Sequence, residues 1–174
     1  LNTKSKIKNP TDKIEDVKGD IEFNNVSFTY PESGINALKN ISFKVKQGET
    51  LAIVGRTGSG KSTVVNLLLR NYDLNEGAIL IDNKNIKEIN LNHFRENVGY
   101  VPQDVFLFSD TIENNIAFGY KNRLPEKEII EQAAKDAVIY ASIKEFDKGF
   151  KTRVGERGVT LSGGQKQRIS IARA

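Results

Sequence analysis

The glycine-rich run Gly55–Thr63, G-R-T-G-S-G-K-S-T, has the residue types and the spacing that surround nucleotide phosphates. Its three glycines allow backbone conformations with positive φ and leave no Cβ between the amides and an anion. Lys61 offers a positive charge to the β and γ phosphates, and Ser62 offers a hydroxyl to Mg²⁺. Thr63 falls in the first turn of an expected helix, where free N–H groups favour negative charge. The sequence therefore predicts a nucleotide-binding phosphate loop, a motif that by itself fits kinases, GTPases and helicases alike: Gly55, Arg56, Thr57, Gly58, Ser59, Gly60, Lys61, Ser62 and Thr63.

A second glycine-rich run, L-S-G-G-Q, lies near the end of the sequence. It places a serine hydroxyl and two flexible glycines at what reads as a helix start, with the helix dipole behind them. By itself the run fits either an anion cradle or an ordinary N-capped helix. Its place downstream of a phosphate loop favours the cradle, made of Leu161, Ser162, Gly163, Gly164 and Gln165.

The phosphate loop needs a strand before it and a helix after it. The apolar run Leu51–Val54 predicts a strand buried on both faces of a parallel sheet. Residues 62–70 alternate between apolar and polar side chains at helical spacing and predict the helix. Residues 78–82 and 98–101 are expected to be further strands.

The residues on either side of this core have patterns of their own. Ile21 to Tyr30 alternates with a break at Asn24-Asn25, and residues 41–45 alternate too, which predicts half-exposed antiparallel strands with a bulge. Pro125 suits a helix start. The apolar stripe expected on that helix is Ile129, Ile130, Ala133, Ala134, Ala137 and Val138.

Composition limits the function. A chain of 174 residues, 38% of them hydrophobic, fits one globular domain. It has no cysteine for a disulfide, a thiolate metal site or a nucleophile, no secretory signal, and no apolar run long enough to span a bilayer. Its net charge of +4 comes from scattered lysines and arginines, so we expect no nucleic-acid partner.

Leu161–Gln165 and the residues that follow resemble the signature of the ATP-binding cassette (ABC) family and its helix. In that resemblance Tyr30, in F-T-Y-P, is the aromatic residue that stacks on adenine, although a core strand tyrosine has the same pattern. Gln103, in V-P-Q-D, is the glutamine that meets the metal and the attacking water, although it also reads as a surface residue. Val154–Gly158, with Glu156, resembles the segment before the signature in ABC exporters, or else a charged turn. Residues 104–115 also resemble the exporter pattern.

The resemblance implies an α/β fold, with a P-loop NTPase core, a small antiparallel β subdomain and a helical subdomain that carries the signature. We expect residues 1–20 to be an arm from an upstream membrane domain and residues 21–174 to be the cassette. Residues 21–103 would form the β subdomain and core, and residues 104–174 the mainly helical part. The cassette is expected to be incomplete at its C-terminus, which would leave the strand before the phosphate loop with an unpaired edge.

Two such domains face each other head to tail in the family, so the signature residues would touch the ATP of the partner. The expected partners are a second nucleotide-binding domain, the same or homologous, and the membrane domain of the same transporter, at the cytoplasmic face of the membrane. Ser62 and Gln103 would meet Mg²⁺. The metal-associated Asp, the catalytic Glu and the switch His are expected beyond Ala174, and His93 reads as a surface or helix-end residue. No residue is therefore assigned as the catalytic base, and the chain alone is expected to be inactive.

The sequence thus predicts the ATP-binding, and in the full-length protein ATP-hydrolysing, domain of a membrane exporter. Two alternatives stay open. One is a soluble ABC ATPase of translation or DNA repair, which shares both glycine runs. The other is a nucleotide-binding fragment without turnover.

Overall fold

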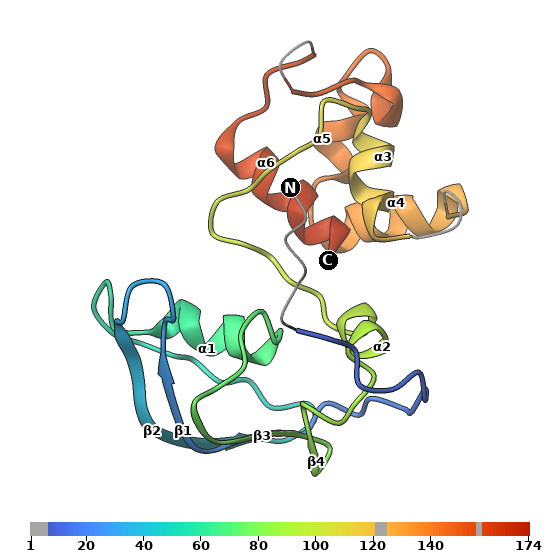
Figure 1. The fold of residues 1–174 in the computed structure, drawn as a ribbon. Helices are drawn as coiled ribbons and strands as arrows, with labels where there is room; N and C mark the ends of the chain where they lie inside the picture. The colour runs from blue at the N-terminus through green and yellow to red at the C-terminus, as the bar shows by residue number, and fades with distance from the viewer. Residues whose placement is uncertain (1–6, 121–124, 156–157) are drawn as a thin grey trace, which may run out of the picture. The chain divides into compact units, whose positions relative to one another are not determined.

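The structure is a computed structural model that describes residues 7–120, 125–155 and 158–174. It divides into two compact units, one ending at Val98 and the other beginning at Gly99. The first unit holds a four-stranded sheet with α1 and α2, and the second is mainly helical (Figure 1). Among the described residues, no helix combines the length and the apolar character needed to cross a membrane.

The sheet of the first unit has the strand order β2-β1-β3-β4, and every pairing is antiparallel. The strands are β1 (Ile21–Thr29), β2 (Asn36–Val45), β3 (Glu76–Ile81) and the short β4 (Lys84–Asn85). The antiparallel strands expected from alternation are therefore confirmed.

The break in β1 is also where the sequence predicts it. The pairing of β1 with β2 shifts register between Phe23 and Val26, and Asn25 has a φ of 49°. The backbone N–H of Asn25 donates to a side chain of β2, Ser42 Oγ, at 2.8 Å. The extra residue keeps Phe23, Val26 and Phe28 buried.

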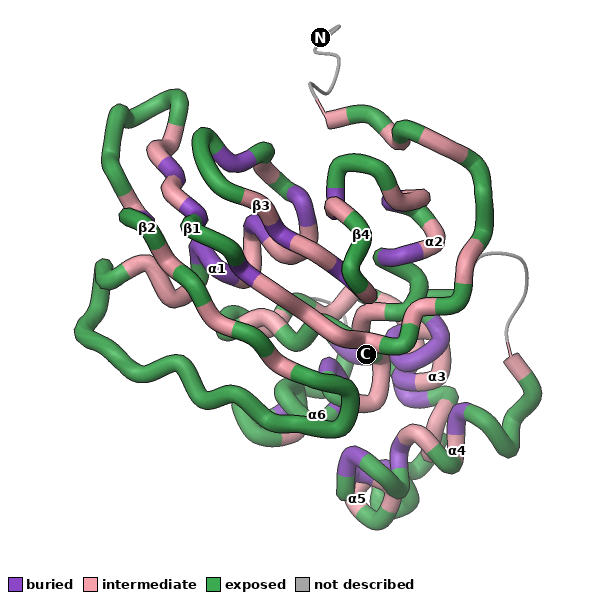
Figure 2. Tube along the Cα trace, turned by 90° about the horizontal axis from the view of Figure 1, so that it is seen from below, coloured by how far each residue is buried: buried purple, intermediate pink, exposed green. Residues whose placement is uncertain are grey.

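Two helices cover the same side of this sheet: α1 (Lys61–Leu68) and α2 (Leu91–Glu96) (Figure 1). Figure 2 shows buried positions on both helices and along β1 and β3. The core between these elements is formed by Phe23, Val26, Phe28, Leu38, Val64, Leu67, Leu74, Ile79, Ile81, Ile86, Leu91 and Phe94.

The segment of residues 7–20 has neither helix nor strand and lies against the first unit. The Asp82 carboxylate accepts hydrogen bonds from the backbone N–H groups of Lys18, Gly19 and Asp20, at 2.8, 3.1 and 3.0 Å. His93, in α2, bonds through Nε2 to the Glu15 carbonyl at 3.0 Å. Residues 7–20 of the expected arm therefore contain no helix or strand, and they are bonded to Asp82 and to α2. The role of the arm as a linker stays a prediction.

Two of the predicted strands are wrong. Leu51–Val54 and Val98–Val101 have no strand structure, and all four residues of the first run are exposed, Val54 to 92%. A strand exists only where its backbone pairs with a neighbour. No described residue forms a ladder with either run, and no strands pair in parallel in the part of the chain that the structure describes. The apolar composition of the two runs therefore predicted strands wrongly, because no described segment pairs with either run.

The second unit packs four α-helices around its own core: α3 (Ile112–Ile116), α4 (Lys127–Asp136), α5 (Tyr140–Lys144) and α6 (Gly163–Arg173). Short 3₁₀ helices lie at Ala117–Gly119 and Gly149–Lys151. The buried hydrophobic residues of this core are Ile112, Ile116, Ala117, Ile130, Ala134, Ala137, Ile139, Ile143, Val154, Leu161 and Ile169.

The stripe expected on α4 is partly wrong. Ile130, Ala134 and Ala137 are buried, but Ile129 and Val138 are exposed. Val138 lies beyond the C-cap Ala137 and has a φ of 54°, so it no longer follows the helical period. Ile129 lies one residue, about 100° around the helix, from the buried Ile130.

Candidate phosphate-binding site

The phosphate loop lies at the N-terminus of α1, as predicted. Gly58 and Gly60 have φ values of 82° and 89°, which side-chain-bearing residues rarely adopt. A Cβ on Gly60 would also lie 2.5 Å from the Ala37 carbonyl oxygen of β2, so the loop needs glycine there for space as well. Gly55 does not have a positive φ. The expected positive φ is therefore wrong at Gly55, and a Cβ there would displace the Ser59 hydroxyl, whose Oγ lies 2.6 Å away.

The ammonium group of Lys61, at the end of the loop, bonds back to the start of the loop. Lys61 Nζ donates to the carbonyl oxygens of Gly55 and Arg56, both at 2.8 Å. These two bonds hold a positive charge at the start of α1, where the helix N–H groups are free. The exposed residues Arg56, Thr57 and Ser59 complete the surface of the loop. An anion in this position would meet a cation and a helix terminus together.

Ser62 and Thr63 differ in their surroundings. Ser62 is exposed on the first turn of α1, whereas Thr63 is only 4% exposed. Thr63 Oγ1 lies 3.1 Å from the Tyr30 hydroxyl, in hydrogen-bond contact. The structure therefore brings Tyr30, which follows β1, to the phosphate-loop helix.

The signature run begins α6 with a capping box. Ser162 Oγ accepts from the Gln165 backbone N–H at 3.2 Å, and the Ser162 N–H donates to Gln165 Oε1 at 2.9 Å. The Ser162 hydroxyl proton remains free to be donated, because the cap uses only the oxygen. Gly163 and Gly164 are exposed, with nothing within 4 Å of a Cβ on either, while Leu161 is buried. The run therefore forms an N-capped helix start with two exposed glycines, and its role as an anion cradle stays a prediction.

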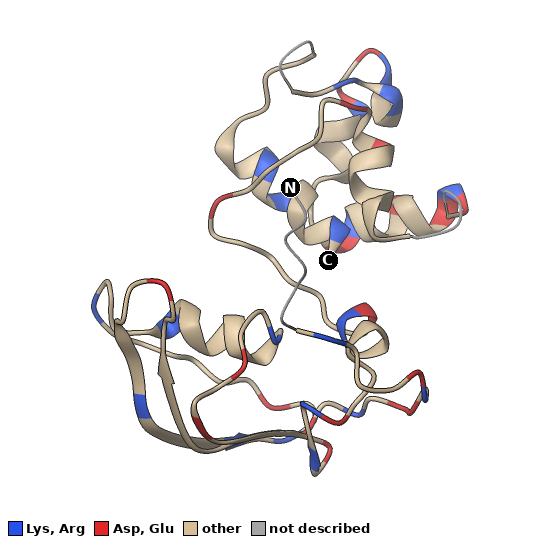
Figure 3. Ribbon diagram, in the orientation of Figure 1, with Lys and Arg blue, Asp and Glu red and all other residues tan. Residues whose placement is uncertain are grey.

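Gln103 is exposed and lies outside any helix or strand, near the start of the second unit. Tyr30 and the phosphate loop belong to the first unit, and Gln103 and the signature run to the second. Val154 is buried and Gly155 has a φ of 100°, but Glu156 lies outside the described residues. Figure 3 shows the positions of basic and acidic residues interspersed along each unit, without a long block of one sign.

The residues present fit a metal held mainly by a nucleotide. Within the described ranges, no group of three or more His, Cys, Asp or Glu side chains could hold an ion by itself. Mg²⁺ in nucleotide sites uses few protein oxygens and keeps phosphate and water ligands. An exposed serine hydroxyl beside Lys61 is suitable for that arrangement.

Sequence reasoning missed one contact and two participants near the site. It placed Thr63 in the phosphate loop but did not find that its hydroxyl contacts Tyr30. It did not find Ala37, whose carbonyl restricts Gly60, or Tyr72, whose ring packs against Tyr30. Each of these contacts joins residues that are distant in the sequence, so no local spacing of residues predicts it.

A glycine loop closed by a lysine at a helix start, with the sheet beside it, defines a P-loop nucleotide-binding domain, and the signature run narrows the class to ATP-binding cassettes. A model of the ABC transporter family matches residues 38–174. The chain belongs to this family, whose domain binds ATP.

The chain is similar to ATP-dependent lipid A-core flippases. It is 49% identical to that of Pasteurella multocida (strain Pm70) over 164 residues, and 49% identical to that of Escherichia coli (strain K12) over 161 residues. These alignments cover 94% and 92% of the chain but 28% of each flippase. The structure also resembles a bacterial Atm1-family ABC exporter solved with ATP bound, with a TM-score of 0.82 and 44% identity over 90% of this chain and 27% of that one. The chain therefore spans just over a quarter of the length of these relatives.

Proposed function

We propose that this chain is one of the two nucleotide-binding domains whose ATP binding and hydrolysis power a membrane exporter. Its phosphate loop binds ATP, and the signature run of a second copy, or of a homologous domain, completes the site. The observation that carries the proposal is the pair of open helix starts: α1 with Lys61 in the loop, and α6 with the exposed Gly163 and Gly164. Each provides free N–H groups and a dipole: α1 for the triphosphate bound by this chain, and α6 for the triphosphate bound by its partner.

The residues of the chain then have distinct roles. The Tyr30 ring stacks on the adenine, the loop amides and Lys61 hold the phosphates, and the Ser162 hydroxyl donates to the partner's nucleotide. Ser62 and Gln103 hold Mg²⁺, which neutralises charge on the phosphates when it is bound. Closing the two domains around ATP converts binding energy into a conformational step, and hydrolysis in the full-length protein releases it.

This conformational change is passed to the membrane domain of the same transporter, at the cytoplasmic face of the membrane. The relatives that support this are flippases and an exporter. The flippases are named for lipid A-core, which is therefore the first substrate class to test. The same relatives do not favour a soluble ATPase of translation or DNA repair. A nucleotide-binding role without turnover is separated from the proposal by measuring hydrolysis.

The test uses the full-length protein reconstituted in lipid vesicles, with ATP hydrolysis and ATP-dependent movement of a lipid A-core glycolipid as readouts. Lys61→Ala should abolish both, because it removes the charge at the phosphates. Lys87→Ala, at an exposed lysine outside the loop, should leave both unchanged. Wild-type hydrolysis in Lys61→Ala would contradict the site, and hydrolysis without glycolipid movement would contradict that substrate class.

A further inference from the structure

Three aromatic rings gather where β1 ends near α1. The Tyr30 ring lies 4.9 Å from the Phe28 ring and 5.2 Å from the Tyr72 ring, between centroids, and the Tyr72 and Phe28 rings are 5.5 Å apart. Both contacts of Tyr30 are close to perpendicular, at 79° and 88°. Edge-to-face geometry of this kind is a favourable arrangement for aromatic pairs. Neither neighbour stacks flat on the Tyr30 ring.

Tyr30 is also attached at its tip. Its hydroxyl contacts Thr63 Oγ1 at 3.1 Å, so the end of the ring is tied to the first turn of α1. A tyrosine held only at its hydroxyl can still rotate about its side-chain bonds. The edge contact with Tyr72 supplies a second point of attachment and fixes the plane of the ring.

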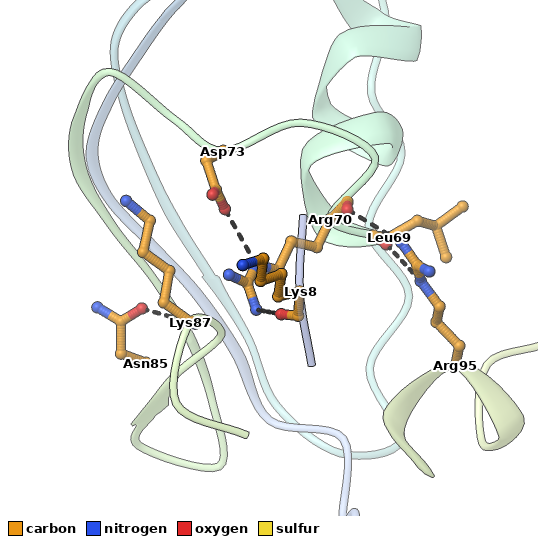
Figure 4. Close-up of polar contacts among 7 residues, drawn as sticks. All are labelled: Lys8, Leu69, Arg70, Asp73, Asn85, Lys87 and Arg95. Carbon is orange, nitrogen blue, oxygen red and sulfur yellow. Dashed lines mark hydrogen bonds and ion pairs between the residues drawn. The ribbon is translucent and has the colours of Figure 1, made fainter. Parts of the chain in front are cut away.

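Tyr72 can serve as such a support because the turn that carries it is itself fastened (Figure 4). Arg95 donates from Nε to the Leu69 carbonyl and from Nη2 to the Arg70 carbonyl, both at 2.9 Å. These bonds satisfy carbonyl groups left free at the end of α1. Each is charge-assisted, which makes it stronger than a neutral hydrogen bond.

Arg70 fastens the same turn from inside. It is 7% exposed and has a φ of 49°, and its Nε donates to Asp73 Oδ1 at 3.0 Å across Tyr72. The neighbouring Asn71 N–H donates to the Asn66 carbonyl at 2.8 Å. The turn that carries Tyr72 is therefore held by hydrogen bonds both before Tyr72, at residues 69–71, and after it, at Asp73.

We propose that Tyr72 is a positioning residue of the ATP site: from the turn held by Arg70 and Arg95, its ring keeps the Tyr30 ring in the orientation that receives the adenine base. The inference rests on the proposed function, in which Tyr30 stacks on adenine. The ring contacts of Tyr72 run to Tyr30 and Phe28, so its loss acts on the base and not on the phosphates.

The test compares ATP with tripolyphosphate, which offers the phosphates without the base, as ligands of the full-length protein. Tyr72→Leu should weaken ATP binding by about 3- to 10-fold, the size of a lost aromatic pair, and leave tripolyphosphate binding unchanged. Tyr72→Phe keeps the ring and should bind ATP as the wild type does. Unchanged ATP affinity in Tyr72→Leu, an equal loss for both ligands, or an equal loss in Tyr72→Phe would each overturn the inference. If Tyr72→Leu fails to fold, Tyr72→Met, which keeps apolar volume without a ring, replaces it under the same criteria.

Tyr30→Ala separates this inference from the proposed function. It should weaken ATP and spare tripolyphosphate, and Tyr72→Leu added to it should cause no further loss. If Tyr30→Ala leaves ATP binding unchanged, the adenine contact is wrong and the role of Tyr72 falls with it. If Tyr30→Ala weakens ATP while Tyr72→Leu does not, only the role of Tyr72 is overturned.

Discussion

Arg173, at the end of α6, donates twice to Asn115 of α3. Its Nε lies 2.8 Å from the Asn115 backbone oxygen, and its Nη2 lies 3.0 Å from the side-chain oxygen. Asn115 is completely buried, and its amide nitrogen donates to the carbonyl oxygens of Phe108 and Thr111, both at 3.0 Å. This pair fastens the signature helix to the rest of the second unit.

Asn115→Ala should loosen α6. The substitution removes the side-chain partners of the Phe108 backbone N–H and carbonyl and one of the bonds that Arg173 donates, at a cost of about 2 kcal/mol, which is roughly 30-fold faster opening. Hydrogen exchange of the α6 backbone amides in the full-length protein measures this directly. Asn92→Ala, at an exposed position of α2, is the control and should leave α6 exchange unchanged. Equal exchange in both variants would show that Asn115 does not fasten the helix.

Gly60→Ala should deform the phosphate loop. The new Cβ would meet the Ala37 carbonyl and Leu38 Cδ2, at 2.5 and 2.9 Å, in addition to the strain of a φ of 89°. Gly48→Ala is a matched control, since Gly48 has a φ of 81° with nothing within 4 Å. We expect Gly48→Ala to cost about 1 kcal/mol of stability and to keep ATP affinity, and Gly60→Ala to cost more and to lose at least about tenfold in ATP affinity. Calorimetric titration with ATP measures the difference, and equal affinities would contradict the close approach.

Glu15 should stay ionised to unusually low pH. Hydrogen bonds from the Lys13 ammonium and then the Lys84 ammonium lower the pKa of the Glu15 carboxyl from 4.5 to about 2. Because the pKa is depressed in the folded state, the contribution of Glu15 to docking of residues 7–20 is present above pH 4.5 and is lost as the pH falls through about 2. A titration of the Glu15 carboxyl by NMR should therefore show a midpoint well below 4.5. A midpoint near 4.5 would mean that Lys13 and Lys84 do not pair with Glu15.

Two substitutions of Ser162 separate its cap from its proposed contact with ATP. Asn and Asp are both good N-caps, so Ser162→Asn and Ser162→Asp should each keep the start of α6. Only Asp adds a negative charge where the partner's triphosphate is expected. ATP hydrolysis by the full-length protein should be at least about tenfold slower in Ser162→Asp than in Ser162→Asn. Matching rates would remove Ser162 from the nucleotide site.

The sequence predicts the local parts of this structure well. The phosphate loop, α1, the capped start of α6 and the bulge at Asn25 follow from residue types within a few positions of one another. Leu51–Val54 was predicted wrongly because a strand depends on a partner that local pattern does not reveal. Contacts such as Tyr72 with Tyr30, or Arg173 with Asn115, join distant segments and need the folded chain to be seen.

The shared site is tested most directly by a cross-link between copies. These 174 residues contain no cysteine, so Ser59→Cys in one copy of the full-length protein and Gly163→Cys in another place new thiols at the exposed phosphate loop and signature run. The account predicts a disulfide between the two copies that forms with ATP and is lost when the Ser59→Cys copy also carries Lys61→Ala. A disulfide that forms equally without ATP, or none between copies when ATP is present, would contradict it.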